Sequence, residues 1–299
     1  MTAGLKPGVH CISTTPFLPD ESLDEASLKT LLDYLILGGC DGALVLGVLG
    51  EADRLSDLER DRVLHGALDH AGDRLQISVG ITHGSTVISA ARAKSAEGAG
   101  VAAVMVSPPP GSVAGLALSD HFRRIGDGLT IPVIVQDHPA SSGVKMPVEF
   151  IASLYEHLPT ASIVKLEEPP TANKMARLLE LQPGYQLFGG LGGVALYHEL
   201  EAGSAGAMTG FALVEFLVGI VSAYQAGDTE RAFERYEDAL PLMVFEAQPG
   251  AGVALRKEIL RRRGAIAHAV VRQPAPKPDA FSLAMLDQLL ARVSEGVTA

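Results

Sequence analysis

The chain has 299 residues, of which 47% are hydrophobic and 20% charged, and this balance excludes a disordered protein. The formal net charge of −11 argues against a nucleic-acid-binding protein, which would need a basic face. Tryptophan is absent and aromatic residues make up only 5%, so we expect an aliphatic core. The two cysteines, Cys11 and Cys40, lie in apolar stretches and are expected to be reduced core residues.

The N-terminus shows no apolar run of the length that a signal peptide needs. No stretch approaches 18 apolar residues without a charged or turn residue, so a membrane span is not expected. The sequence therefore predicts a cytoplasmic protein without a membrane partner.

Short β-rich runs alternate with amphipathic segments of helical pattern along the first three quarters of the chain. Eight βα units within one domain-sized stretch predict a closed (β/α)8 TIM barrel, an α/β fold; a doubly wound open sheet is the runner-up. The continuous apolar runs suit parallel strands that are buried on both faces. The expected strands are residues 9–13, 42–46, 75–79, 102–106, 132–136, 162–165, 185–188 and 205–208.

Helix start signals support this alternation. Ser56 is followed three residues later by Glu59, the spacing of a capping box, and an apolar stripe begins at Val63. We expect a helix that begins directly after Ser56 and covers the barrel.

The alternation ends near residue 225. Helical patterns then occupy residues 227–242, 252–263 and 282–293, and a proline-rich stretch at 273–278 reads as a stiff linker. We therefore expect a barrel over residues 1–225 and a C-terminal helical extension over residues 226–299, with no second catalytic domain.

In a TIM barrel the functional site lies at the carboxyl ends of the strands, and this rule nominates its residues. Strand ends carry hydroxyl, amide, imidazole, ammonium and carboxylate groups together with glycine-rich turns. The resulting candidates are Thr15, Val48, Leu49, Gln136, His138, Lys165, Glu167, Gly190 and Thr209.

Lys165 is the one lysine among eight that follows an apolar β run. Burial among aliphatic side chains disfavours an ammonium, and a neutral amine can attack a ketone to form a Schiff base. The alternative is a structural lysine paired with Glu51 or Glu167. Helical segments with polar neighbours hold Lys29, Lys94, Lys174 and Lys257.

Glu167 lies two residues beyond Lys165, so both side chains project to the same side if the strand continues. A carboxylate beside an imine can move protons during catalysis. The alternative roles are a simple ion-pair partner or a contact with the next helix.

Four short motifs lie near these strand ends. They are Thr15-Pro16-Phe17 with Asp20, residues 47–51 followed by Leu55-Ser56 and Glu59-Arg60, residues 132–135 leading to Pro139 and Gly143, and Val164-Lys165. Over nearly the whole chain this set resembles the dihydrodipicolinate synthase/N-acetylneuraminate lyase family of class I aldolases and dehydratases. The resemblance implies a Schiff base on Lys165, no cofactor, and a homo-oligomer, either a dimer or a tetramer built from dimers.

The chain departs from this family at several positions. Val48 and Leu49 replace the threonines that bind the carboxylate of a 2-keto acid, so the backbone N–H groups remain as its donors. Gln136 replaces the proton-relay tyrosine, and residues 108–110 are prolines where the family has Pro-Tyr-Tyr. The arginine that binds a dicarboxylate is also replaced, by residues 140–142. A role in lysine biosynthesis is therefore not expected.

One subgroup of the family fits better. Residues 136–140, 165–170 and 172–174, with Gly203 and residues 206–208, look like those of 2-keto-3-deoxy-L-arabonate dehydratases. The loop at residues 47–51 differs from that subgroup, so the exact substrate does not transfer.

Other constellations carry less weight. No His-x-His or His-Glu-x-x-His spacing occurs, so we expect no metal site, and no dinucleotide fingerprint appears. His138 is either a proton donor or a hydrogen-bonded loop residue. Residues 189–193 form either a phosphate cradle or a short loop that admits a keto acid.

Together the residues and the resemblance predict a metal-independent, Schiff-base-forming lyase, a dehydratase or aldolase, for a small-molecule 2-keto acid. A 2-keto-3-deoxy sugar acid is the expected substrate. Lys165 would form the imine, and Glu167 with Gln136 would handle protons. The alternatives are synthase-like pyruvate condensation, a barrel that binds a phosphorylated ligand, and a non-catalytic binding member.

Overall fold

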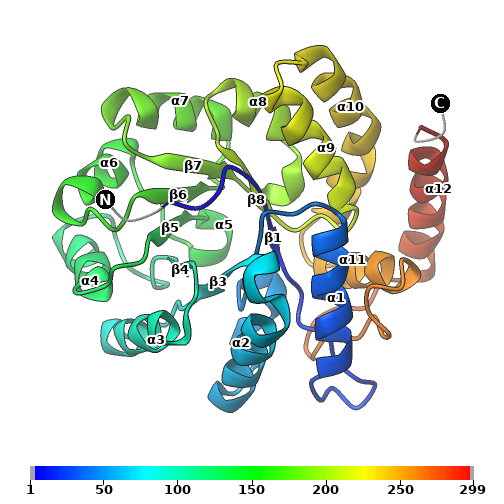
Figure 1. The fold of residues 1–299 in the computed structure, drawn as a ribbon, viewed down its shortest axis with the longest axis horizontal. Coiled ribbons are helices and arrows are strands. Elements are labelled where there is room, and N and C mark those ends of the chain that lie inside the picture. The colour runs from blue at the N-terminus through cyan, green and yellow to red at the C-terminus, as the bar shows by residue number, and fades with distance from the viewer. Residues whose placement is uncertain (1–3, 297–299) are drawn as a thin grey trace.

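Eight parallel strands close into a barrel in sequence order, with β1 pairing both β2 and β8 (Figure 1). The structure is a computed structural model that describes residues 4–296, with side chains through Val293. Each of the eight predicted strands is present, with its bounds shifted by about one residue at most ends. The strands are β1 (Gly8–Ile12), β2 (Gly42–Val45), β3 (Gln76–Gly80), β4 (Ala103–Val106), β5 (Val133–Asp137), β6 (Ile163–Leu166), β7 (Gln186–Gly189) and β8 (Gly206–Thr209).

Helices connect the strands and surround the barrel. The capping box predicted at Ser56 and Glu59 is confirmed, since Ser56 accepts the Glu59 N–H and Glu59 accepts the Ser56 N–H. The surrounding helices are α1 (Glu25–Leu37), α2 (Asp57–Ala71), α3 (Thr86–Ala99), α4 (Leu116–Gly126), α5 (Pro139–Ser142), α6 (Val148–His157), α7 (Thr171–Leu181), α8 (Leu196–Glu201) and α9 (Val214–Gln225). Short 3₁₀ turns are η1 (Val48–Gly50), η2 (Ala52–Arg54), η3 (Gly72–Arg74) and η4 (Leu191–Gly193).

Alternation along each strand divides the apolar residues into two clusters. Ile134 and Ile163 belong to a cluster that fills the barrel interior with Ile12, Leu44 and Phe188. Neighbouring strand residues join the larger cluster between the barrel and its helices. A residue two positions beyond Ile134 or Ile163 therefore belongs to the interior face.

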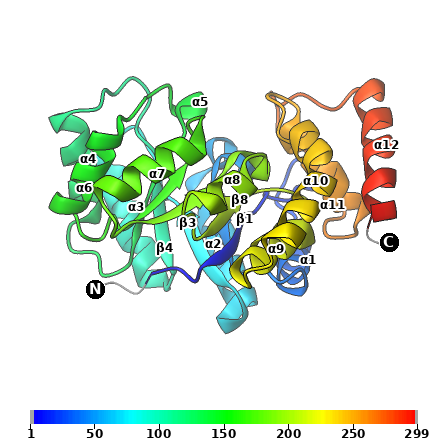
Figure 2. The same cartoon turned by 90° about the horizontal axis from the view of Figure 1, so that it is seen from above.

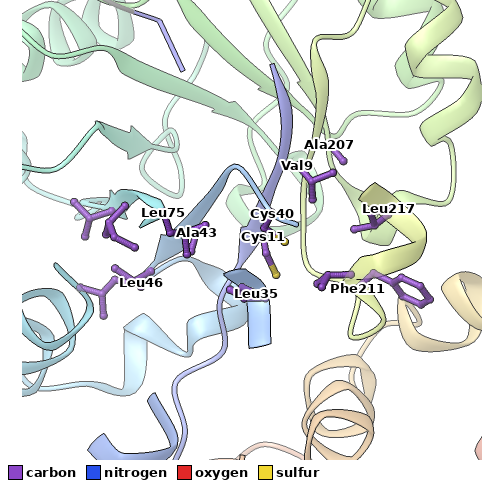
Figure 3. Packing of buried hydrophobic residues seen from close by; sticks show 14 of the residues in the cluster. Val9, Cys11, Leu35, Cys40, Ala43, Leu46, Leu75, Ala207, Phe211 and Leu217 are labelled. Carbon is purple, nitrogen blue, oxygen red and sulfur yellow. The ribbon is translucent and has the colours of Figure 1, made fainter. Parts of the chain in front are cut away.

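The larger cluster is mostly aliphatic, as the composition predicts, with a few aromatic side chains such as Phe211. Figure 3 shows Cys11 on β1 close to Cys40, with Leu35 from α1 beside them. Both cysteines are buried and free, so the prediction of reduced core residues is confirmed.

Three further helices follow the barrel: α10 (Thr229–Glu246), α11 (Gly252–Arg262) and α12 (Ala280–Gly296). Figure 2 shows them stacked beside α9 and α1 on one flank of the barrel. The helices correspond to the three predicted ones, while the division of the chain at residue 225 stays a prediction. Within residues 4–296, no helix combines the length and apolar character needed to cross a bilayer.

Candidate active site

A cavity of about 380 Å³ lies where the carboxyl ends of the strands meet the C-terminal helices. Lys165, Glu167 and Gln136 form part of its wall, together with Val48, Leu49, His138 and Thr209. The connection between α10 and α11, residues 246–253, closes it from the side of the extension. Seven of the nine predicted site residues are thus brought together in one cavity.

The interior periodicity of the strands explains the centre of this site. Lys165 follows Ile163 by two residues and Gln136 follows Ile134 by two, so both point into the top of the barrel. Parallel pairing sets Gln136 directly beside Lys165. Both side chains are buried.

Glu167 connects the two. Its Oε2 atom lies 3.0 Å from Lys165 Nζ and accepts a hydrogen bond of 2.8 Å from Gln136 Nε2. Burial raises the pKa of Glu167, but Lys165, His138 and the Gln136 amide outweigh burial and hold that pKa below its usual value. The carboxylate is therefore ionised at neutral pH and can accept a proton from its neighbours.

Gly190 makes room for this carboxylate. A Cβ atom at position 190 would lie 2.3 Å from Glu167 Oε1, so any other residue would displace the Glu167 side chain. Gly190 itself is absent from the cavity wall. The structure thus places Gly190 behind Glu167, and its expected contact with substrate stays a prediction.

His138 lies on the cavity wall and its Nδ1 shares a hydrogen bond with the Ser141 hydroxyl at 2.8 Å. Burial lowers the pKa of His138; Glu167 partly opposes this and Lys165 adds to it. The imidazole is thus neutral at pH 7.

The turn η1 after β2 presents unused backbone donors. The N–H groups of Val48 and Leu49 have no hydrogen-bond acceptor among the described residues, and both residues line the cavity. Leu46 and Glu51, on either side of the turn, adopt positive φ values of 59° and 53°. Such backbone strain is costly for non-glycine residues and is concentrated at functional sites.

Thr15 belongs to the support of this turn. Its hydroxyl donates a hydrogen bond of 2.7 Å to the Gly50 carbonyl, and Thr15 is absent from the cavity wall. The hydroxyl of Thr15 thus holds the turn, and the expected contact of Thr15 with substrate stays a prediction.

The glycine-rich segment after β7 has little capacity for a phosphate. The N–H of Leu191 donates to Glu167 Oε1 and that of Gly192 donates to Thr209 Oγ1, at 3.3 and 2.8 Å. The N–H of Gly193 donates to the Gly190 carbonyl. The segment therefore supports Glu167 and Thr209, and a phosphate here would lie against the Glu167 carboxylate.

The structure corrects the expectation that polar residues surround Lys257. The helical pattern suggested polar neighbours, but Lys257 is fully buried and donates to Glu51 Oε1 at 2.6 Å and to the Val270 carbonyl at 2.7 Å. Burial lowers the pKa of Lys257 to about 8, although Glu51 partly restores it. Lys257 is absent from the cavity wall and reaches the turn η1 only through Glu51.

The sequence did not predict a second ion pair in the cavity wall, between Arg256 and Glu246. Arg256 on α11 donates from Nε to Glu246 Oε1 at 2.5 Å, and the Ala212 N–H donates to Glu246 Oε2. Both charged side chains are buried. No motif marked them, because α10 and α11 were expected only to pack on the barrel. Over the described residues, no cluster of three histidine, cysteine, aspartate or glutamate side chains is arranged to hold a metal ion.

Comparisons with known proteins show the family to which this chain is related. Residues 7–290 match the profile of the dihydrodipicolinate synthetase family. An L-2-keto-3-deoxyarabonate dehydratase from Azospirillum brasilense is 32% identical over 90% of this chain and 89% of its own. A 4-hydroxy-tetrahydrodipicolinate synthase from Acidothermus cellulolyticus is 29% identical over 97% of this chain and 95% of its own.

Solved structures of similar fold cover nearly the whole chain. The dihydrodipicolinate synthase of Rhodopseudomonas palustris superposes with a TM-score of 0.93 at 29% identity, covering 98% of this chain and 99% of that one. The Escherichia coli protein YagE, in complex with pyruvate, shares the fold with a TM-score of 0.89 at 22% identity, over 97% of this chain and 99% of its own. This chain therefore belongs to the dihydrodipicolinate synthetase family, whose members are class I Schiff-base lyases.

Proposed function

We propose that this lyase forms a Schiff base on Lys165 and dehydrates a 2-keto-3-deoxy sugar acid. The observation that carries the proposal is the pair Lys165–Glu167, which is buried in the wall of the cavity with a nitrogen–oxygen distance of 3.0 Å. A lysine that can pass its proton to a neighbouring carboxylate is poised to become a nucleophile.

In the first step Glu167 accepts a proton from the Lys165 ammonium, and the neutral amine attacks the C2 ketone. The keto oxygen leaves as water and a protonated imine forms. The substrate carboxylate is held at this stage by the free N–H groups of Val48 and Leu49. Donors fixed in advance cost no reorganisation when the reaction begins.

The imine then acts as an electron sink. A proton leaves C3, its electron pair forms an enamine, and the C4 hydroxide departs with a proton as water. Glu167 is the titratable group in contact with Lys165 and is our candidate for these transfers, with Gln136 orienting it through the 2.8 Å hydrogen bond. Water finally hydrolyses the imine and regenerates Lys165.

Dehydration is favoured over synthase-like condensation for two reasons. The relative that is 32% identical over 90% of this chain is named a dehydratase. In addition, the residues that line the cavity include no tyrosine, and the position of the family's relay tyrosine holds Gln136, which cannot ionise. A phosphate-binding barrel is disfavoured by the engaged N–H groups of residues 191–193.

The proposal also retains a homo-oligomer in the cytoplasm. Sedimentation of the purified protein tests the oligomer, and a monomer at micromolar concentration would contradict it.

The function is tested by incubating the protein with 2-keto-3-deoxy-L-arabonate and following the products by NMR. We expect loss of water from C3 and C4, abolished in Lys165→Ala and retained in Lys145→Ala, whose side chain is exposed. Cleavage of the C3–C4 bond would reassign the protein as an aldolase. Condensation of pyruvate with an aldehyde, in the absence of dehydration, would overturn the proposal.

A further inference from the structure

The Arg256 guanidinium has an unused donor in the wall of the cavity. Arg256 is 4% exposed, and its Nη1 has no hydrogen-bond partner among the described residues. A buried donor without an acceptor costs about 1–3 kcal/mol, so proteins seldom leave one unpaired, and an ordered water, an ion or a ligand usually fills the place. Arg256 is also the one arginine in that wall.

The position of Nη1 relates it to the turn η1. A Cβ atom built on Gly210 would lie 3.0 Å from Arg256 Nη1 and 2.8 Å from Leu49 Cδ1. The guanidinium therefore lies near the side chain of Leu49, in the turn whose Val48 and Leu49 N–H groups have no acceptor among the described residues. Arg256, Val48 and Leu49 all line the same cavity.

The ion pair with Glu246 fixes this geometry. Glu246 engages Nε and is itself held by the Ala212 N–H, so the planar guanidinium is locked while Nη1 remains available. Glu246 also offsets the cost of burying the positive charge.

We propose that Arg256 binds the C1 carboxylate of the 2-keto acid, together with the N–H groups of Val48 and Leu49; this rests on the proposed function. Val48 and Leu49 have no side-chain hydroxyl, so their turn offers an anion only two backbone donors. A charged donor from α11 compensates for that deficit. The C-terminal extension is then part of the substrate site.

The test compares two ligands that differ at this group. Pyruvate and pyruvamide both present a C2 ketone to Lys165, but only pyruvate carries a carboxylate. The half-saturating concentration of each is measured by borohydride-dependent labelling of the protein. Arg256→Lys keeps the charge but loses the Nη1 donor. The double variant Glu246→Gln, Arg256→Met removes the pair without leaving a buried carboxylate alone. Arg261→Met, on the exposed side of the same helix, is the matched control.

We expect wild type and Arg261→Met to prefer pyruvate. In the double variant the half-saturating concentration of pyruvate should rise about 10- to 100-fold, the worth of one hydrogen bond to a charged group. That of pyruvamide should stay unchanged, so the preference collapses, and Arg256→Lys should fall between. A preference retained in a folded double variant, shown by unchanged circular dichroism, would overturn the assignment.

Failure of the proposed function gives a different pattern. If neither ketone labels wild type, imine formation is wrong, and carboxylate binding is then read in Lys165→Ala by thermal stabilisation. Pyruvate should raise Tm more than pyruvamide does, and only while Arg256 is present. Equal stabilisation by both ligands would overturn the inference on its own.

Discussion

Glu167 contacts three other groups of the site. It touches Lys165, accepts a hydrogen bond from Gln136 and accepts the Leu191 N–H. Because its pKa is held below the usual value, it begins the reaction as a base. Gln136 can orient the carboxylate but cannot exchange a proton at neutral pH.

Replacing Glu167 by Gln should separate imine formation from turnover. We expect Glu167→Gln to form the imine more slowly, because the Lys165 proton must then pass to water, but to reach the same final borohydride labelling by a 2-keto acid, because the Lys165 amine remains in place. Dehydration should slow by about 10²–10⁴-fold, the usual contribution of a general acid or base. Steady-state rates and labelling yields measured on the same preparation check both expectations.

The matched control is Glu168→Gln, which alters the neighbouring carboxylate that pairs with Lys174 instead. Near-full turnover of Glu167→Gln would place the proton chemistry elsewhere, and His138 on the same wall would become the residue to test.

The sequence predicted Lys165 as the Schiff-base lysine because it is the one lysine at the end of an apolar strand, where burial disfavours the ammonium. It could not separate the pairing with Glu167 from one with Glu51. Glu51 pairs with Lys257, 206 positions away in the chain. A contact over that distance leaves no local pattern. Glu246 and Arg256 are only 10 positions apart, but they lie on different helices, α10 and α11, so no helical spacing marks their pairing.

Among the elements, the turn η1 depends on the C-terminal extension. Glu51 directly follows the turn, and both of its carboxylate oxygens are engaged: Lys257 donates to one, and the N–H of Arg272 and the guanidinium of Arg54 donate to the other. Lys257 and Arg272 also lie over the ring of Phe17. The extension thereby fixes the end of the segment that carries the unused N–H donors.

Loss of the ion pair between Lys257 and Glu51 should destabilise the protein and weaken the binding of a 2-keto acid. Lys257→Met removes the buried cation of Glu51 and leaves only the partly exposed Arg54 guanidinium beside the buried carboxylate. Removing one partner of a buried ion pair typically costs about 3–5 kcal/mol, and the contact with Arg54 reduces that cost. Urea unfolding should show this loss, and the half-saturating concentration of a 2-keto acid should rise.

Two variants sharpen the test. The double variant Glu51→Gln, Lys257→Met should recover part of the stability, since no charge is left uncompensated. Lys94→Met, at an exposed position on α3, should change neither quantity. Equal stability of Lys257→Met and Lys94→Met would contradict the role assigned to this ion pair.

The strands were predictable because each is a short apolar run bounded by turn residues, and a TIM barrel repeats that unit eight times. The inner face of α11 was not predictable from pattern, because it carries Arg256 and Lys257 where an apolar stripe is expected. A polar residue facing a buried partner looks like a solvent-exposed residue in the sequence.

For the whole molecule, the carboxyl of Glu199 couples stability to pH. Glu199 on α8 is fully buried, and neither of its oxygens has a hydrogen-bond partner among the described residues. Burial raises the pKa of Glu199 to about 7. The side chain of Thr171 lowers that pKa in part, and the negative charge of Glu167 raises it further. A Cβ at Gly189 would lie 1.7 Å from Glu199 Oε2, which shows how closely the carboxyl packs on β7.

The native state therefore holds a proton that the unfolded state releases near pH 4.5. Between about pH 4.5 and pH 7 the free energy of unfolding should fall as pH rises, and this contribution should level off above pH 7. The full effect of Glu199 is about 3 kcal/mol. Asp137, whose pKa burial raises to about 6 against the opposing effect of Lys174, acts in the same direction.

Glu199→Gln should remove its share of this dependence, so the variant gains stability relative to wild type as pH rises from 5 to 8. Urea unfolding at several pH values measures this, with Glu149→Gln at an exposed position of α6 as control. Parallel pH profiles for wild type and Glu199→Gln would show that the carboxyl does not titrate as described.

Formation of the imine on Lys165 is tested by reducing the protein with borohydride in the presence of isotopically labelled pyruvate and mapping the adduct by peptide mass spectrometry. We expect a single labelled lysine, Lys165, among the eight in the chain, and no label in Lys165→Arg. Labelling at Lys145, Lys174 or Lys257, or no labelling by pyruvate or any 2-keto-3-deoxy sugar acid, would contradict it.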